Sequence, residues 1–123
     1  MTGMQYTTRM EPRHGALERI DVGAIAAAVE ERWYNETLCT VNTSLLRLGV
    51  VQGEYHWHAH EGQDELFYVV DGRVTIEVEG RDPVDLAPGQ AFVVPAGVRH
   101  RPIAPVRSVM LMVEESGVTP TGD

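Results

Sequence analysis

The chain has 123 residues, 43% of them hydrophobic and 23% charged, which fits one globular domain that can bury a core without disulfides. Eighteen acidic against ten basic residues give a net charge of −8, which argues against nucleic acid or an anionic membrane as the partner. The one cysteine, Cys39, excludes an intrachain disulfide. With no basic residue close to it in sequence, we expect a buried, inert thiol.

The N-terminal residues do not have the pattern of a signal peptide. Met1–Arg13 is polar, and the best apolar stretch, Val22–Val29, is short. No apolar run approaches the roughly 20 residues that a membrane-spanning helix needs. We therefore expect a cytoplasmic protein.

The first 36 residues predict an arm and one short helix. Met1–Arg19 is interpreted as an irregular arm or an added edge strand. Asp21 can cap a helix, because its carboxylate can accept hydrogen bonds from the first free amide groups. Four apolar residues would then share one face of the helix: Val22, Ala26, Val29 and Trp33. We expect this helix to pack across one end of a barrel.

From Thr37 onward the sequence predicts strands. Leu38–Val51 is rich in β-branched residues and leucine and predicts one long or bent strand, and Glu54–His60 alternates after Gly53. Further strands are expected at Glu65–Val70, Val74–Val78, Val84–Leu86, Ala91–Val94, Val98–Arg101 and Val106–Val113.

Turn signals divide these strands, and Asp71-Gly72 is the best short hairpin signal among them. Many short strands with turns every 8–12 residues or so are typical of a sandwich or barrel. We therefore expect an all-β barrel over residues 37–113, followed by a tail over residues 114–123.

Three histidines alternate in the segment that follows Gly53. His56, His58 and His60 would share one face of a strand, because successive side chains point to opposite faces. The Cα atoms of His58 and His60 would then lie roughly 6.6 Å apart. That spacing suits two imidazoles on one metal ion, with metal–nitrogen distances of about 2.0–2.2 Å.

A carboxylate and a fourth ligand complete the candidate site. Glu65 follows a turn and can lie beside His60, whereas Glu61 would point the other way if the strand continued, so we prefer Glu65. Turns at Gly89 and at residues 95–97 would deliver His100 back to the interior. The neighbours of His100, Arg99 and Arg101, would then point outward.

These residues resemble the two motifs of the cupin superfamily. The first motif, Gly-(x)5-His-x-His-(x)3–4-Glu-(x)6-Gly, matches Gly53, His58, His60, Glu65 and Gly72, with four residues in place of five after the first glycine. The second motif, Gly-(x)5-Pro-x-Gly-(x)2-His-(x)3-Asn, matches Gly89, Pro95, Gly97 and His100, with Ala104 in place of the asparagine. The resemblance covers Gly53–Ala104 directly, and the strand pattern extends it to most of Thr37–Val113.

The resemblance implies a single-domain jelly-roll β-barrel of six to eight strands, here with a short N-terminal helix. It implies that one divalent transition-metal ion is held by His58, His60, Glu65 and His100. The segment Asp64–Gly72 is similar to small one-domain cupins described as like mannose-6-phosphate isomerase, which describes their fold more than their activity. Cupins commonly pair through an exchanged or added edge strand, so we expect a homodimer in which Met4–Arg19 provides that strand.

Several residues keep two interpretations. His56 would lie roughly 13 Å along the strand from His60, too far for the same ion, and is either a pocket residue or exposed. His14 is interpreted as a solvated tail residue. Arg47 enters the pocket if it faces inward with Leu45, whereas Ser44, Leu46 and Leu48 are as plausible an inward set. Arg99, Arg101 and Arg107 could attract an anion but are better interpreted as solvated surface.

Three histidines and one carboxylate leave about two positions open on a six-coordinate ion, and such ligands suit Fe(II), Mn(II), Ni(II), Cu(II) or Zn(II). The leading hypothesis is a metal-dependent enzyme acting on a small organic substrate, by O2 activation or by Lewis-acid isomerisation or cyclisation. Glu65 would also accept a proton, and His56 or Tyr55 would assist at the mouth. The alternatives are a non-catalytic, sugar-like small-molecule binding module and a barrel whose metal is only structural.

Overall fold

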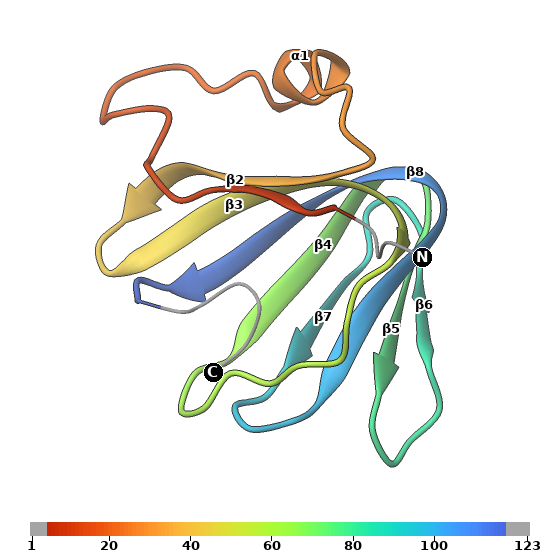
Figure 1. The fold of residues 1–123 in the computed structure, drawn as a ribbon. Helices are drawn as coiled ribbons and strands as arrows, with labels where there is room; N and C mark the ends of the chain where they lie inside the picture. Colours follow the sequence, from red (N-terminus) through yellow and green to blue (C-terminus); the bar gives the residue numbers. More distant parts are fainter. Residues whose placement is uncertain (1–4, 118–123) are drawn as a thin grey trace.

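A computed structural model describes residues 5–117 of the chain, which fold into one curved sheet with a short helix on its outer face (Figure 1). In chain order the elements are β1 (Thr7–Arg9), α1 (Val22–Ala27), β2 (Trp33–Val41), β3 (Ser44–Glu54), β4 (Glu65–Asp71), β5 (Val74–Val78), β6 (Val84–Leu86), β7 (Ala91–Val94) and β8 (His100–Glu115). The predicted all-β fold with a short N-terminal helix is confirmed.

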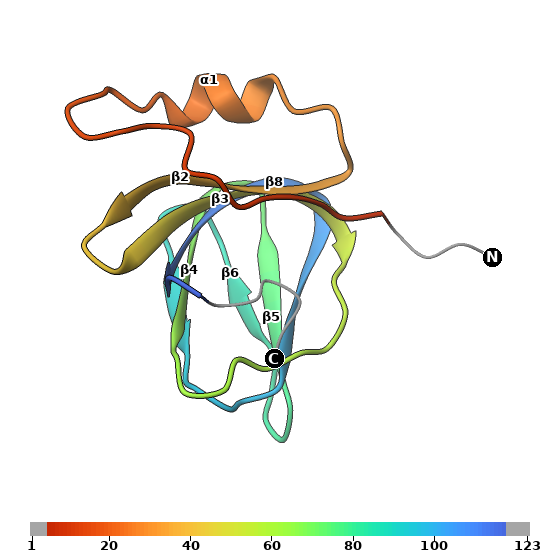
Figure 2. The same cartoon turned by 60° about the vertical axis from the view of Figure 1, so that its left-hand side comes forward.

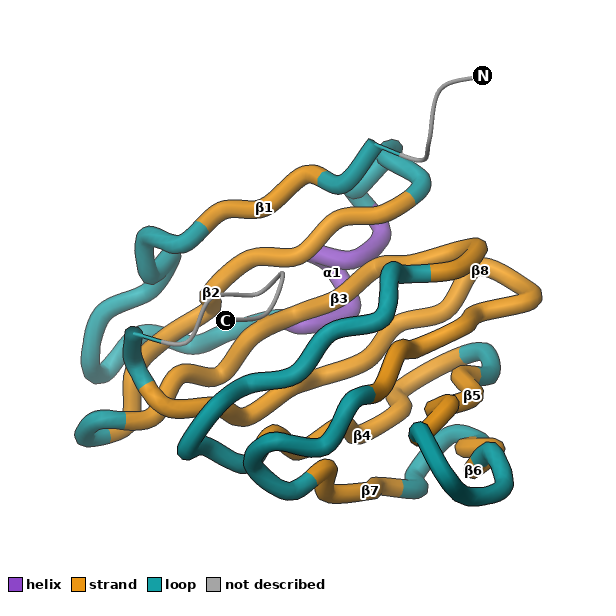
Figure 3. Tube along the Cα trace, turned by 60° about the horizontal axis from the view of Figure 1, so that its bottom comes forward, coloured by secondary structure: helices purple, strands orange, loops and turns teal. Residues whose placement is uncertain are grey.

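The long strand β8 connects the two parts of the sheet. β3 pairs antiparallel with most of its length, from Ile103 to Glu115, whereas β4 pairs with its C-terminal part and β5 with its N-terminal part. The main strand order is β1-β2-β3-β8-β4-β7, and β6 extends the sheet beside β5. The strands curve around a common interior (Figure 3). Aromatic and aliphatic side chains fill this interior, among them Trp33, Phe67, Val69, Ile76 and Met110.

The prediction of one strand over Leu38–Val51 is wrong. The chain reverses at Asn42 and Thr43, so this stretch belongs to the β2–β3 hairpin. Asn42 has a φ of 54°, a left-handed conformation that asparagine tolerates better than most residues. Because the sequence on both sides of the turn is equally strand-like, composition alone did not reveal the boundary.

The prediction of separate strands at Val98–Arg101 and Val106–Val113 is also wrong, because β8 runs without a break from His100 to Glu115. Pro102 and Pro105 lie within it. A proline removes one hydrogen-bond donor from a strand but keeps its carbonyl acceptor. The carbonyl of Pro102 accepts a hydrogen bond from the amide of Tyr55, at 3.1 Å.

Asp71-Gly72 forms a turn, but the strands on its two sides do not form the predicted hairpin. β4 pairs with β7 and β8, whereas β5 pairs with β6 and with the other end of β8. Gly72 has a φ of 83°, and a Cβ atom there would meet Ser108 and approach the carbonyl oxygen of Arg107 to 2.8 Å. The glycine therefore serves a sharp change of direction packed against β8.

The helix α1 begins where the sequence predicts, because the Asp21 carboxylate accepts a hydrogen bond from the amide of Ala24 at 3.0 Å. It ends at Ala27, so Trp33 lies in β2 and not on the helix face. Figure 2 shows α1 across the outer face of the sheet, above β2, β3 and β8, and not across a barrel end. Below it lies an outer cluster formed by Ala26, Leu38, Leu48 and Val50.

The N-terminal arm adds β1 to the edge of β2 in parallel, within the same chain. The homodimer stays a prediction. His14 is half-buried near Glu18, with 3.5 Å between Nδ1 and Oε1, so its assignment as a solvated tail residue is wrong. Cys39 is also half-buried and not fully buried. Within residues 5–117, no helix has the length and apolar character needed to cross a membrane.

Candidate metal centre

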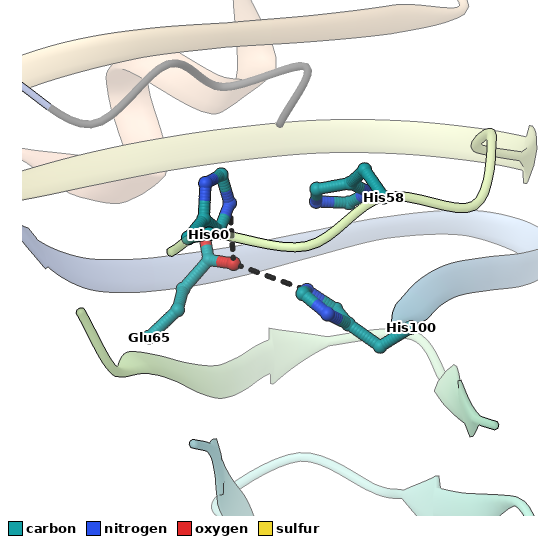
Figure 4. A group of neighbouring side chains, drawn as sticks. All are labelled: His58, His60, Glu65 and His100. Carbon is teal, nitrogen blue, oxygen red and sulfur yellow. Dashed lines mark hydrogen bonds and ion pairs between the residues drawn. The ribbon is translucent and has the colours of Figure 1, made fainter. Parts of the chain in front are cut away.

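The four predicted metal ligands come together at one end of the barrel interior (Figure 4). One ligand atom from each side chain lies within 4.8 Å of the others. All four are buried, with relative exposures of 8% for His58, 3% for His60, 6% for Glu65 and 1% for His100. This group could hold a metal ion.

Backbone pairing between the two histidine segments builds the group. The prediction of a strand over Glu54–His60 is wrong, because β3 ends at Glu54. His58 instead forms an isolated antiparallel bridge with His100, with N–O distances of 3.0 and 2.9 Å. The amide of Gly97 donates to the carbonyl of His60 at 2.9 Å. The histidines are thus placed by contact with a segment about 40 residues away in sequence.

Backbone carbonyls orient two of the imidazole rings. Nδ1 of His58 lies 3.0 Å from the carbonyl oxygen of His56, and Nδ1 of His100 lies 2.9 Å from that of Val98. A neutral ring that donates from Nδ1 keeps its Nε2 lone pair for a metal ion. Nε2 of His100 and Nε2 of His60 lie 3.3 and 3.4 Å from Oε1 of Glu65.

The electrostatics of the group fit a divalent ion. Burial lowers the pKa of His58 to about 4, which keeps this ring neutral near pH 7. Burial opposes the charge of Glu65, but the close contacts with the imidazoles of His100 and His60 outweigh it and lower the pKa to about 2. The Nε2 atoms of His60 and His100, at 3.4 and 3.3 Å from the Glu65 oxygen, have the spacing expected of ligands around one ion with bonds of about 2.0–2.2 Å.

A cavity with about 30 Å³ of free volume reaches this group, with His58 and Glu65 in its lining. The same cavity is lined by a second set of buried polar side chains, which we call the inner polar cluster: Asn35, Arg47 and Glu114. Of the two orientations left open for Arg47, the structure has the inward one. Asn35 and Glu114 were not predicted as site residues, because isolated polar residues in strands carry no signal of their partners.

The inner polar cluster touches the candidate metal group. The Arg47 guanidinium donates to Oδ1 of Asn35, and its Nη1 lies 3.4 Å from Oε1 of Glu114. Glu114 also lies close enough to Glu65 for the two carboxyl groups to repel each other when both are charged. Burial and the negative charge of Glu65 raise the pKa of Glu114 to about 7. A polar network therefore runs from the metal group into the barrel.

The remaining predicted residues lie at the mouth or outside. The His56 ring stacks on Tyr55 with ring centroids 4.3 Å apart, and it is not part of the four-residue group. Burial raises the pKa of Tyr55 to about 12, so its phenol stays protonated. Arg99 and Arg101 flank the Trp57 ring on the outside, as expected.

Ala104, at the position where the second motif has asparagine, is fully buried and pairs with Gly53. Its side chain belongs to the apolar interior cluster, so this departure from the motif leaves the barrel packed.

Comparison with known proteins places the chain among characterised folds. The cupin domain family profile matches residues 47–114. The Bacillus subtilis (strain 168) protein YdbB, named as uncharacterized, is 38% identical over 91 residues, which cover 74% of this chain and 80% of YdbB.

Two solved structures show the same likeness in three dimensions. A cupin-2 domain protein from Shewanella frigidimarina NCIMB 400 has a TM-score of 0.73 and 27% identity, covering 78% of this chain and 93% of that one. KdgF from Halomonas sp. has a TM-score of 0.63 and 27% identity, covering 71% and 82%.

Proposed function

This chain belongs to the cupin domain family, and from that premise we propose that it is a metal-dependent enzyme acting on a small organic substrate inside the barrel. The observation that carries the proposal is the buried group of His58, His60, Glu65 and His100, whose ligand atoms gather within 4.8 Å beside a cavity. When bound there, a divalent transition metal supplies either O2 chemistry or Lewis-acid polarisation of a carbonyl or hydroxyl.

The residues of the chain have separate tasks in this proposal. Burial keeps the His58 imidazole neutral, and backbone carbonyls orient the rings of His58 and His100. Glu65 provides the negative charge of the group, and in this proposal it also accepts a proton from the substrate. Tyr55 lines the cavity with a protonated phenol that can donate a hydrogen bond, and His56 stacks beside it at the mouth.

Elemental analysis tests the proposal. Untagged protein is purified without added metal and compared by inductively coupled plasma mass spectrometry with the His58→Ala, His100→Ala double variant. We expect close to one metal ion per chain in the parent and little in the variant. Iron or copper would direct the assay to O2 consumption, and zinc or manganese to isomerisation and cyclisation.

Two results would argue against the enzyme. A parent protein that holds no metal, even after reconstitution, contradicts metal dependence and favours a small-molecule binding module. A metal that raises thermal stability without any turnover across both assay classes favours a structural ion.

A further inference from the structure

Arg47 is the most unusual buried residue outside the candidate metal group. It is 1% exposed and lies on β3, facing the barrel interior, among the residues that line the cavity. The same cavity is lined by His58 and Glu65 of the metal group. A guanidinium remains charged at any ordinary pH, so its burial is costly unless its donors are matched by acceptors.

The acceptors around Arg47 are incomplete. Its Nη atoms have Asn35 as a close partner, and the contacts with Glu114, the Arg9 carbonyl and the Met10 sulfur are all 3.4 Å long. Nε is buried and has no hydrogen-bond partner among residues 5–117. The four Nη hydrogens thus have acceptors within the chain, and the Nε–H group is the donor that residues 5–117 leave without one. This buried N–H group is available to a ligand.

The charge of the cavity favours an anion. With a divalent ion in place, the ion and Arg47 contribute three positive charges, and Glu65 and Glu114 offset at most two of them. One carboxylate would neutralise the remainder in a poorly solvated space. The free volume is about 30 Å³, and a water needs about 10–15 Å³ on this measure, so the ligand must be small.

We propose that Arg47 binds the carboxylate of a small organic acid, and that a second oxygen atom of the same acid reaches the metal ion. The substrate is then a compact, carboxylate-bearing molecule. This inference rests on the proposed function, because it requires a metal ion at His58, His60, Glu65 and His100. Glu114 is then the acidic side chain of the cavity that interacts both with Arg47 and with Glu65.

Glycolate, with its neutral analogue glycolamide, is the probe. Each is titrated calorimetrically into the metal-loaded protein, and metal content is measured on the same samples. We expect glycolate to bind and glycolamide to bind about ten- to a hundredfold more weakly, as for loss of a charge-assisted hydrogen bond. Glycolate that fails to bind a metal-loaded parent, or binds no better than glycolamide, overturns the inference.

Variants separate Arg47 from the rest of the site. Arg47→Met alone would leave Glu114 buried without its partner and endanger folding, so it is combined with Glu114→Gln, which removes both charges. This double variant should keep its metal and lose about ten- to a hundredfold in glycolate affinity. Glu114→Gln alone should not weaken glycolate binding, because it removes no donor group from Arg47.

Arg99→Met is the matched control, because Arg99 is a half-exposed arginine outside the barrel. It should leave glycolate affinity unchanged. Unchanged glycolate affinity in the Arg47→Met, Glu114→Gln variant, with metal retained, means that Arg47 is only structural and contradicts the inference. Loss of metal from the parent itself contradicts the proposed function instead.

Discussion

Arg47 and Leu48 are neighbours on β3, and both are almost completely buried, yet they face opposite sides of the sheet. On the outer side, Leu48 packs with Ala26, Leu38 and Val50 beneath α1. These side chains are apolar and need no hydrogen-bond partner. On the inner side, Arg47 lies among other charged groups with part of its hydrogen-bonding capacity unused. Burial on the outer face thus explains stability, whereas buried charge on the inner face indicates ligand binding.

The largest effect is expected when charge is removed from the inner face at the metal group. Glu65→Gln should weaken metal affinity about a thousandfold, because it removes the one anionic ligand of the group. This loss is larger than that expected when a residue that only hydrogen-bonds to a ligand is replaced. A competition titration against a chelator measures the effect. The matched control is Glu61→Gln, which changes the exposed rival carboxylate and should bind metal normally. An equal loss of metal affinity in both variants would mean that the assignment of Glu65 as the carboxylate ligand is wrong.

A change on the outer face should act on stability alone. Leu48→Ala leaves a cavity in the outer cluster and should lower the free energy of unfolding by about 3 kcal/mol. Urea denaturation followed by tryptophan fluorescence gives this value, and metal content per folded chain should stay as in the parent. The control is Val106→Ala on the exposed part of β8, expected to cost under about 0.5 kcal/mol. Metal loss in Leu48→Ala would show that the two faces are not independent.

The pH dependence of the metal-free protein tests the inner face again. The pKa of Glu114 is raised to about 7 by burial and by Glu65, from 4.5. The protonated form of Glu114 is therefore favoured in the folded state. Its stabilising contribution to the free energy of unfolding is fully present below pH 4.5 and is lost as the pH rises through 7. The expected loss in the free energy of unfolding is about 2–3 kcal/mol. Urea denaturation between pH 5 and pH 8 should show a flatter profile for Glu114→Gln than for the parent.

Glu79→Gln, on the exposed surface, is the control for that experiment and should follow the parent profile. Parallel profiles for the parent and Glu114→Gln would mean that Glu114 is charged in the folded state throughout, and the inner face would then be better solvated than its burial suggests.

The smallest effect is expected at the cap of α1. Asp21→Ala removes the hydrogen bond to the Ala24 amide and should cost about 1 kcal/mol of stability, with no change in metal content. Thermal unfolding monitored by circular dichroism measures it, and Asp21→Asn, which can still cap the helix, should behave as the parent. A metal-affinity change in Asp21→Ala would connect the helix to the inner face.

The same contrast explains what the sequence could predict. The metal group could be predicted because its residues fall in two spaced motifs. Turn residues such as Gly72 mark changes of direction. Arg47 was left with two orientations because β3 is buried on both faces, so alternation of polar and apolar residues is lost. Glu114 was missed because its partners come from β3 and β4. Long-range pairing decides such contacts, and one strand's composition does not encode it.

The strand errors have the same cause. Asn42 makes a turn inside a run of strand-forming residues, and Pro102 lies inside a strand because Tyr55 uses its carbonyl. Trp33 was assigned to the helix face by its spacing, but pairing with Val51 places it in β2. In each case the neighbouring strand determined the local structure more strongly than the local sequence did.

The most direct test of the metal site is an anomalous-scattering map from crystals of the metal-loaded protein, collected at the absorption edge of the element found. We expect one strong peak, about 2.0–2.3 Å from Nε2 of His58, His60 and His100 and from a carboxylate oxygen of Glu65. A peak on another set of side chains, such as His14 with Glu18, would contradict it, as would crystals of the metal-loaded protein with no peak inside the barrel.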